Sequence, residues 1–227
     1  MTGPLLRARG VTCRYGSVQA LAPLDLDIAP GERIALTGPN GAGKTTLLTV
    51  LAGVRAPDGG ALEWPQAGPG RVGWVPQRPA LYPRLSVREN LRLFAGLEGA
   101  DDPRGAADHL IARADLGRFA DRRAAALSTG TLQRLNLAIA LAGAPSLLLL
   151  DEPTGTLSPD QRVRLWAWLA DLVRDDGMAL VFSTQSMDEA ARNADRVLVL
   201  AGGALRHDGP AGQLDEAGFM AMVGDDA

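Results

Sequence analysis

The stretch Gly38-Pro39-Asn40-Gly41-Ala42-Gly43-Lys44-Thr45-Thr46 decides the fold of this 227-residue chain. Its spacing is G-x-x-x-x-G-K-[ST], in which successive backbone N–H groups point into one concavity and bind phosphate oxygens. Lys44 is the only lysine among 23 Lys and Arg residues, and its slender ammonium can lie along the loop and reach the β- and γ-phosphates of a nucleotide. The sequence therefore predicts a nucleotide-phosphate site that also holds Mg²⁺ through Thr45, with these binding residues: Gly38, Asn40, Gly41, Ala42, Gly43, Lys44, Thr45 and Thr46.

The sequence around the glycines tests this prediction, because a glycine-rich turn before a helix can also be purely structural. Arg33–Thr37 has the apolar pattern of a short buried strand, and residues 44–52 have the pattern of a helix. The N-terminus of that helix would face a bound anion. Strand, loop and helix therefore occur in the order that phosphate binding requires.

Composition narrows the class of protein. Apolar residues make up 46% of the chain, enough for a sizeable core, and the net charge of −3 comes without a basic stripe, so we expect no nucleic-acid partner. A single cysteine, Cys13, allows no intrachain disulfide.

The longest apolar stretch, 135–150, is interrupted by Asn136 and Pro145 and is shorter than the roughly 20 residues of a membrane span. With no secretory signal visible, we expect a cytoplasmic location.

Apolar segments alternate with helical ones, which predicts an α/β fold with a P-loop NTPase-type, mostly parallel core sheet flanked by helices. We expect one domain over 1–227, with a small N-terminal antiparallel β subdomain in 5–28 and an α-helical insertion over 78–144. The only flexible-looking segments are 65–70 and the C-terminal Gly-Asp-Asp-Ala. Strands are expected at 24–28, 33–37, 147–150, 179–183 and 196–200, and helices at 44–52, 87–95, 105–114, 131–142, 159–174 and 187–193.

Two acids follow the continuous apolar strand Leu147–Leu150. Ligands collect at the carboxyl edge of open parallel sheets, so Asp151 and Glu152 should lie beside the phosphate loop. Asp151 can hold Mg²⁺ through its water shell, and Glu152 is the candidate general base for an attacking water. An Asp-Glu pair can instead cap a helix, but Pro153 disfavours a helix that starts immediately.

With these motifs the sequence resembles the nucleotide-binding subunits of ABC transporters over almost its whole length. The resemblance implies that Tyr15, in Arg14-Tyr15-Gly16, stacks on adenine, although an exposed strand aromatic is the simpler alternative. It also implies that Gln77 contacts Mg²⁺ and water and joins the core to the helical insertion. The segment 81–91 is similar to the surface that receives a membrane partner. It also reads as a capped amphipathic helix that begins after Ser86.

Leu127-Ser128-Thr129-Gly130-Thr131-Leu132-Gln133-Arg134 is similar to the LSGGQ signature of this family. The resemblance implies that Ser128, Thr129, Gly130 and Thr131 open a helix and contact the γ-phosphate of ATP bound to the opposite subunit. It therefore implies a second ABC cassette, in a homodimer or heterodimer that encloses two ATP molecules. An integral membrane subunit on a separate chain would place the cassettes at the inner face of the membrane.

The catalytic face departs from the family pattern at three places. Thr129 and Thr131 replace a glycine and the glutamine of the signature, and Ser158 replaces an aspartate of the loop that follows Glu152. Gln185 stands where the family usually has a histidine that touches the γ-phosphate. A glutamine amide can donate a hydrogen bond but carries no charge. The absence of a charged side chain at position 185 could slow hydrolysis about 10²- to 10³-fold. His109 and His207 do not align with that position.

Two explanations of these departures stay open: slow hydrolysis that depends on a partner cassette, or tolerated drift with Glu152 still catalysing hydrolysis in a homodimer. The expected function is an ATP hydrolase with ATP and Mg²⁺ that powers an exporter of the drug, antibiotic or haem type. The alternatives are a mechanical or regulatory ABC-type ATPase without transport, and a P-loop kinase.

Overall fold

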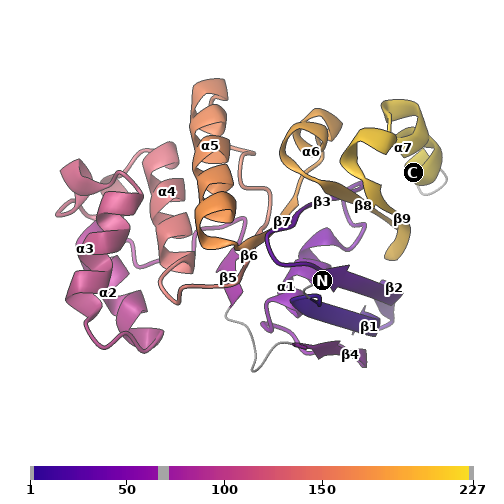
Figure 1. Cartoon of the computed structure of the whole chain (residues 1–227), viewed down its shortest axis with the longest axis horizontal. Helices are drawn as coiled ribbons and strands as arrows, with labels where there is room; N and C mark the ends of the chain where they lie inside the picture. Colours follow the sequence, from indigo (N-terminus) through magenta and orange to yellow (C-terminus); the bar gives the residue numbers. More distant parts are fainter. Residues whose placement is uncertain (1–2, 66–71, 225–227) are drawn as a thin grey trace.

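The computed structural model describes residues 3–65 and 72–224. Its core is a six-stranded sheet in the order β5-β6-β7-β3-β8-β9 (Figure 1). All neighbouring strands are parallel except the edge pair β8 and β9, which is antiparallel. The strands span Val72–Val75 (β5), Leu147–Leu150 (β6), Ala179–Ser183 (β7), Arg33–Thr37 (β3), Arg196–Ala201 (β8) and Ala204–Pro210 (β9).

A second, antiparallel sheet is built by the N-terminal region in the order β2-β1-β4. Its strands span Leu6–Tyr15 (β1), Val18–Ile28 (β2) and Gly59–Glu63 (β4). The first two form a hairpin whose turn is Gly16-Ser17. β2 begins at Val18, six residues before the predicted strand, because its first half pairs with β1. β4 carries two glycines, which by themselves favour a turn. The segment forms a strand because it pairs with β1.

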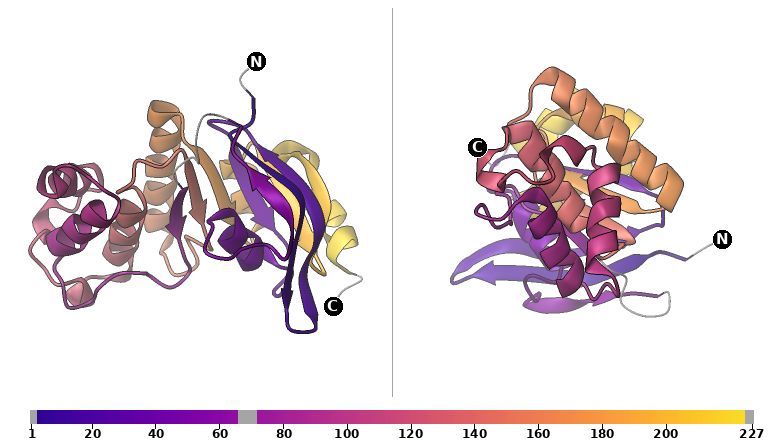
Figure 2. Two further views of the ribbon diagram at one scale, coloured as in Figure 1. Left: turned by 90° about the horizontal axis from the view of Figure 1, so that it is seen from below. Right: turned by 90° about the vertical axis from the view of Figure 1, so that its left-hand side faces the viewer.

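The described residues form seven α-helices. α2, α3 and α4 gather at one end of the molecule, beyond β5, as Figures 1 and 2 show. No helix in residues 3–65 and 72–224 combines the length and apolar character of a membrane span. The helices span Lys44–Leu51 (α1), Val87–Leu97 (α2), Pro103–Arg113 (α3), Thr129–Ala140 (α4), Pro159–Asp176 (α5), Met187–Asn193 (α6) and Glu216–Val223 (α7).

Alternate residues of the core strands pack on opposite faces of the sheet. Leu148 and Leu150 belong to one buried cluster, together with apolar side chains of α5, whereas Leu147 and Leu149 belong to another, together with α1 and the antiparallel sheet. All four leucines are buried, which explains why β6 reads as an unbroken apolar run. The parallel sheet is therefore covered on both faces, as the composition of its strands predicts.

Helix boundaries differ from the predictions where a polar cap sets them. α3 begins at Pro103, two residues early, because the Asp102 side chain accepts from the Arg104 N–H at 3.1 Å. α4 begins at Thr129 because Ser128 is its cap, and it ends at Ala140. The predicted capping box of α2 is present, with Ser86 and Glu89 bonding to each other's backbone. Most of the expected flexible segment 65–70, and the last three residues of the expected tail, lie outside the described residues.

Candidate functional site

The phosphate loop lies between β3 and α1. Lys44 is 7% exposed, and its ammonium donates to the carbonyl oxygens of Gly38 at 2.7 Å and Pro39 at 2.8 Å. Gly38 has φ of +143°, and a Cβ at this position would lie 2.1 Å from the carbonyl oxygen of Leu200. Only glycine can occupy that position without moving β8, so the loop stays pressed against the sheet. Two of the three N–H donors of the Lys44 ammonium thus bond to loop carbonyls, and the third is left for a ligand.

Asp151 joins the loop to the neighbouring strands. It is 4% exposed, directly after β6, and its Oδ2 accepts from Thr45 Oγ1 at 2.8 Å. Its Oδ1 accepts from Ser183 Oγ at 2.6 Å. Thr45 and Asp151, two of the three residues predicted to contact Mg²⁺, are therefore hydrogen-bonded to each other. Ser183 was not among the predicted site residues, although a hydroxyl at the end of an apolar strand is the signal that could have found it.

Glu152 lies where three loops meet. Its backbone has φ of +48°, unusual for a residue with a side chain, and its N–H donates to Ser183 Oγ at 2.8 Å. Its carboxylate accepts from Gln185 Nε2 at 2.8 Å and from Gln77 Nε2 at 3.2 Å. The same Gln185 nitrogen donates to Asn40 Oδ1 at 3.1 Å. Backbone strain of this kind costs about 1–3 kcal/mol and is typical of functional sites, where surrounding contacts hold it in place.

Strand order explains this convergence. β5, β6, β7 and β3 are consecutive neighbours and all parallel, so their carboxyl ends meet at one edge of the sheet. β5 leads to Gln77, β6 to Asp151 and Glu152, β7 to Gln185, and β3 to the phosphate loop. The predicted catalytic residues, Gln77, and the Lys44 region thus come together from four distant parts of the chain.

The charged groups of the site are one ammonium, on Lys44, and two carboxylates, on Asp151 and Glu152. Burial lowers the pKa of Lys44 below its ordinary value, while the nearby carboxylates of Glu152 and Asp151 act in the opposite direction. No group of three His, Cys, Asp or Glu side chains in the described part of the chain could hold a metal by itself. The Thr45 hydroxyl and the Asp151 carboxylate do fit Mg²⁺, which is commonly bound by few protein oxygens together with phosphates and water.

Tyr15 lies at the tip of the β1–β2 hairpin with half of its surface exposed. One face of its ring is covered by the guanidinium of Arg55, 4.2 Å from the ring centroid. Arg55 is fixed in turn by bonds to Cys13 Sγ at 2.8 Å and to the Arg14 carbonyl at 2.6 Å. The exposed surface of Tyr15 must therefore belong largely to the opposite face and the ring edge, which suits stacking on a flat base.

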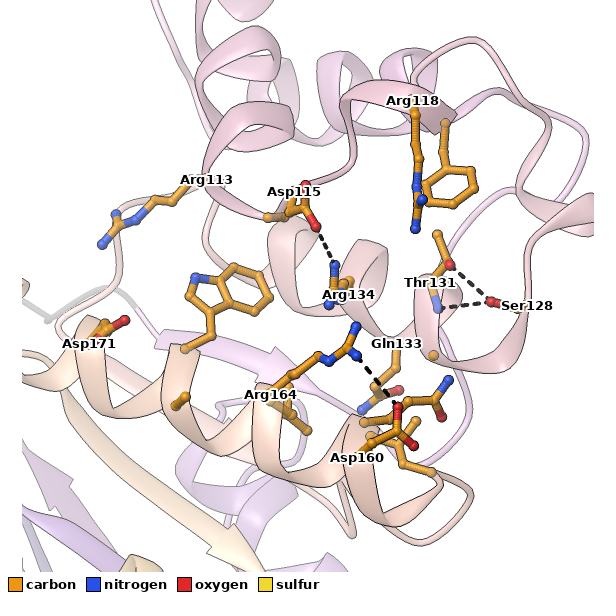
Figure 3. Close-up of a pocket in the computed structure, with 18 residues that line it drawn as sticks. Arg113, Asp115, Arg118, Ser128, Thr131, Gln133, Arg134, Asp160, Arg164 and Asp171 are labelled. Carbon is orange, nitrogen blue, oxygen red and sulfur yellow. Dashed lines mark hydrogen bonds and ion pairs between the residues drawn. The ribbon is translucent and has the colours of Figure 1, made fainter.

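The signature residues lie elsewhere in the molecule, on the first turn of α4. Ser128 Oγ lies 2.9 Å from Thr131 Oγ1 and accepts from the Thr131 N–H at 3.4 Å. These residues border a cavity of about 530 Å³ between α4 and α5, shown in Figure 3. α4 belongs to the helical end of the molecule, whereas the phosphate loop lies beside β3 (Figure 1). A signature that contacts ATP on another subunit must lie apart from the phosphate loop of its own chain, and here it does.

A comparison with families of known proteins agrees with this geometry. The family model described as ABC transporter matches residues 21–155, which is more than half of the chain. The chain belongs to the ABC transporter family. The ABC cassette is accordingly an ATP-binding subunit of this family.

Individual relatives support the assignment of the ABC cassette. It is 38% identical over 213 residues to a sulfate/thiosulfate import ATP-binding protein of Shewanella oneidensis, and the match covers 87% of the cassette but 56% of that protein. An aliphatic sulfonates import ATP-binding protein of Burkholderia cenocepacia is 38% identical over 205 residues, covering 87% and 74% of the two chains. A dimeric ATP-binding cassette solved with ADP and phosphate superimposes with a TM-score of 0.81 at 26% identity, over 91% of this chain and 98% of that one.

Proposed function

We propose that the ABC cassette converts ATP hydrolysis into movement of a separate membrane subunit, working as one ATPase domain over 1–227 with a helical subdomain over 78–144. The observation that carries this proposal is the convergence of the phosphate loop, Asp151, Glu152, Gln77 and Gln185 at one sheet edge. A triphosphate bound along the loop would end beside Glu152, because Asn40 and Gln185 already join the loop to that carboxylate.

Each side chain of the site has a role that follows from its position. Lys44 would turn from the loop carbonyls to the β- and γ-phosphates, and the backbone N–H groups of 38–46 would hold the remaining oxygens. Thr45, Asp151 and Gln77 would hold Mg²⁺, which when bound supplies positive charge to the triphosphate. Tyr15 would stack on adenine, with Arg55 behind its ring.

Glu152 would orient the attacking water and accept its proton as the water oxygen bonds to the γ-phosphorus. The bond from that phosphorus to the β–γ bridging oxygen breaks, and ADP leaves. Gln185 reaches the same carboxylate and would donate to a γ-phosphate oxygen with its amide. Because an amide carries no charge, it stabilises the growing negative charge less than an imidazolium would. We therefore propose that hydrolysis by the cassette alone is slow, or that a partner cassette completes the site.

Two cassettes are needed because the signature and the phosphate loop of one chain lie apart. In the dimer the N-terminus of α4, with Ser128, Thr129, Gly130 and Thr131, would face the γ-phosphate of the opposite subunit. Thr129 and Thr131 add β-branched side chains at this approach, which loosens the contact. The cavity beside Ser128 would then lie next to the dimer interface.

The membrane subunit would contact the loop before α2. Asn90 is fully buried, and its side chain bonds to the backbone of Tyr82 at 2.8 and 3.0 Å and to the Ser86 carbonyl at 2.9 Å. These bonds hold Tyr82 in place with half of its surface exposed. The loop therefore offers a rigid, partly aromatic surface to a partner at the inner face of the membrane.

The direction of transport is a separate proposal. The segment 83–91 and the short stretch between Lys44 and Gln77 resemble those of small exporters, and on that basis we propose export of a drug, antibiotic or haem-like molecule. The two curated relatives carry names of import proteins and give this proposal no support. Accumulation or loss of candidate substrates in inverted membrane vesicles that contain the whole complex distinguishes the two directions.

The main proposal is tested by isolating the cassette from membranes with its partners. We expect a multi-span membrane protein to copurify, and the complex to hydrolyse Mg-ATP faster than the isolated chain. Tyr82→Asp should reduce copurification, whereas Leu97→Asp, at the exposed end of α2, should leave it unchanged. Copurification that is equal in both variants, or a complex without ATPase activity, would contradict the proposal.

A further inference from the structure

Three donors from separate elements meet on the carboxylate of Glu189, in the first turn of α6. Thr154 Oγ1 and Trp166 Nε1 donate to its Oε1 at 2.6 and 3.0 Å, and Thr184 Oγ1 donates to its Oε2 at 2.6 Å. Thr154 and Thr184 are each 4% exposed. Bonds to an ionised acceptor are about twice as strong as neutral ones, so the cluster ties the loop after β6, the loop after β7 and α5 to one another.

The donors stand beside the proposed catalytic residues. Thr154 follows Glu152 by two positions, and Thr184 directly precedes Gln185. Trp166 lies on α5 and packs edge-on against Phe182 of β7, with ring centroids 4.5 Å apart. The Glu189 carboxylate thus joins the segment that carries Glu152 to the segment that carries Gln185.

Helix capping alone does not explain this arrangement. Ser186 caps α6, and its Oγ accepts from the Glu189 N–H at 3.2 Å. A glutamate at this position of a capping box would accept from the backbone N–H of the cap residue. Here the Ser186 N–H donates to Thr184 Oγ1 at 3.1 Å, and that hydroxyl donates onward to Glu189. The carboxylate is therefore turned away from its own helix end and toward the two loops.

We propose that Glu189 is a positioning residue for ATP hydrolysis, whose carboxylate fixes the Glu152 loop relative to the Gln185 loop. This inference rests on the roles proposed for Glu152 and Gln185. A carboxylate only accepts hydrogen bonds and can satisfy all three donors, whereas a glutamine amide offers one oxygen and adds two N–H donors. The Glu189→Gln substitution keeps the size of the side chain and removes at least one of the three contacts.

The test compares Glu189→Gln with the wild-type cassette in steady-state ATP hydrolysis. We expect kcat to fall roughly 10- to 100-fold, because misplacement of catalytic groups by about 1 Å has effects of this size. The KM for ATP should change less than about twofold, since Glu189 has no bond to the phosphate loop in the described structure. The matched control is Asp188→Asn. It alters an exposed carboxylate whose partner among the described residues is Arg192, at 3.5 Å, and it should hydrolyse ATP normally.

Two further readouts separate positioning from general destabilisation. Trp166 emission should shift in Glu189→Gln, and the shift should be absent when Trp166 is also changed to Phe. Thr184→Val and Thr154→Val remove single donors, and each should lower kcat by a smaller factor. In a double-mutant cycle, Glu189→Gln combined with Gln185→Ala should lower kcat less than the product of the two single effects, because one acts through the other.

Two results would overturn the inference: an unchanged kcat in Glu189→Gln, or a raised KM at constant kcat. If that variant fails to fold, wild-type kinetics in both threonine variants would overturn it instead. A wild-type cassette that shows no ATPase activity even in the complex would contradict the proposed function, whereas normal wild-type activity with an unaffected Glu189→Gln variant would contradict this inference alone.

Discussion

Gln185 Nε2 donates to Glu152 Oε1 across 2.8 Å, so the residue that replaces the usual histidine is bonded directly to the proposed general base. The same nitrogen donates to Asn40 of the phosphate loop. The amide therefore lies between two acceptors, Glu152 and Asn40, beside the position that the γ-phosphate of a bound nucleotide would occupy. Gln185 makes this contact with an amide, which carries no charge.

Restoring the charge should raise the rate. We expect Gln185→His to increase ATP turnover by about tenfold or more, because a charged donor stabilises the transition state better than an amide. The variant should also gain an inflection near pH 6.5, the ordinary pKa of histidine, which wild type lacks. Gln185→Ala is the control and should be slower than wild type. Unchanged turnover in Gln185→His would place the limiting step elsewhere, with the altered signature as the next candidate.

Glu152→Gln should separate binding from hydrolysis. Its amide retains one acceptor for Gln77 or Gln185 but cannot accept a proton from water, so we expect turnover to fall at least about 10²-fold. Binding of Mg-ATP, measured by calorimetry, should be within a few-fold of wild type because Lys44 and Thr45 are untouched. Loss of binding and hydrolysis together would show that Glu152 has a structural role instead.

Lys44 can be followed chemically, since it is the only lysine of the chain. Mass spectrometry after treatment with an amine-acylating reagent should show modification of Lys44 that Mg-ATP prevents, with the N-terminal amine as the internal control. Because burial lowers the pKa of Lys44, its charge is lost as pH rises toward 10.5 but before that value is reached. ATP affinity should therefore decline in that alkaline range. Labelling that ATP does not reduce would contradict the proposed role of the phosphate loop.

The Tyr15 ring and the Arg55 guanidinium make a prediction about base recognition. Tyr15→Ala should weaken ATP binding by about 1–3 kcal/mol, the usual contribution of base stacking on an aromatic ring. Binding of inorganic triphosphate, which has no base, should be unchanged, and Tyr15→Phe should behave as wild type. Equal losses for ATP and triphosphate would mean that the substitution disturbs the hairpin rather than a stacking surface.

Two glycines of the phosphate loop provide a stability test. Gly38→Ala would place a Cβ 2.1 Å from the Leu200 carbonyl at φ of +143°, whereas Gly41→Ala at φ of +80° meets nothing within 4 Å. We expect Gly41→Ala to lower the free energy of unfolding by about 1 kcal/mol and Gly38→Ala by about 3 kcal/mol or more, measured by denaturant titration. Equal losses would show that β8 moves freely away from the loop.

Local patterns were sufficient for much of this molecule. The glycine spacing before Lys44, the four leucines before Asp151 and the polar cap at Ser86 depend on neighbouring residues, so they could be recognised one segment at a time. The α/β class and the strands at 33–37, 147–150 and 179–183 followed from the same patterns. Strands β4, β5 and β9 were missed. The pairing partners of β4 and β5 are distant in sequence, whereas β9 pairs with its neighbour β8 and carries a glycine, Gly209, that favours a turn locally.

The sequence by itself determined that the chain binds a nucleotide phosphate and is built around a parallel sheet, since hydrophobic periodicity and loop spacing are local properties. Only the tertiary structure decided which residues touch. It placed Gln185 against Glu152, Ser183 against Asp151, Arg55 over Tyr15 and three donors around Glu189. These contacts depend on the order of strands in the sheet, and that order is set by packing between distant segments, which no local spacing records.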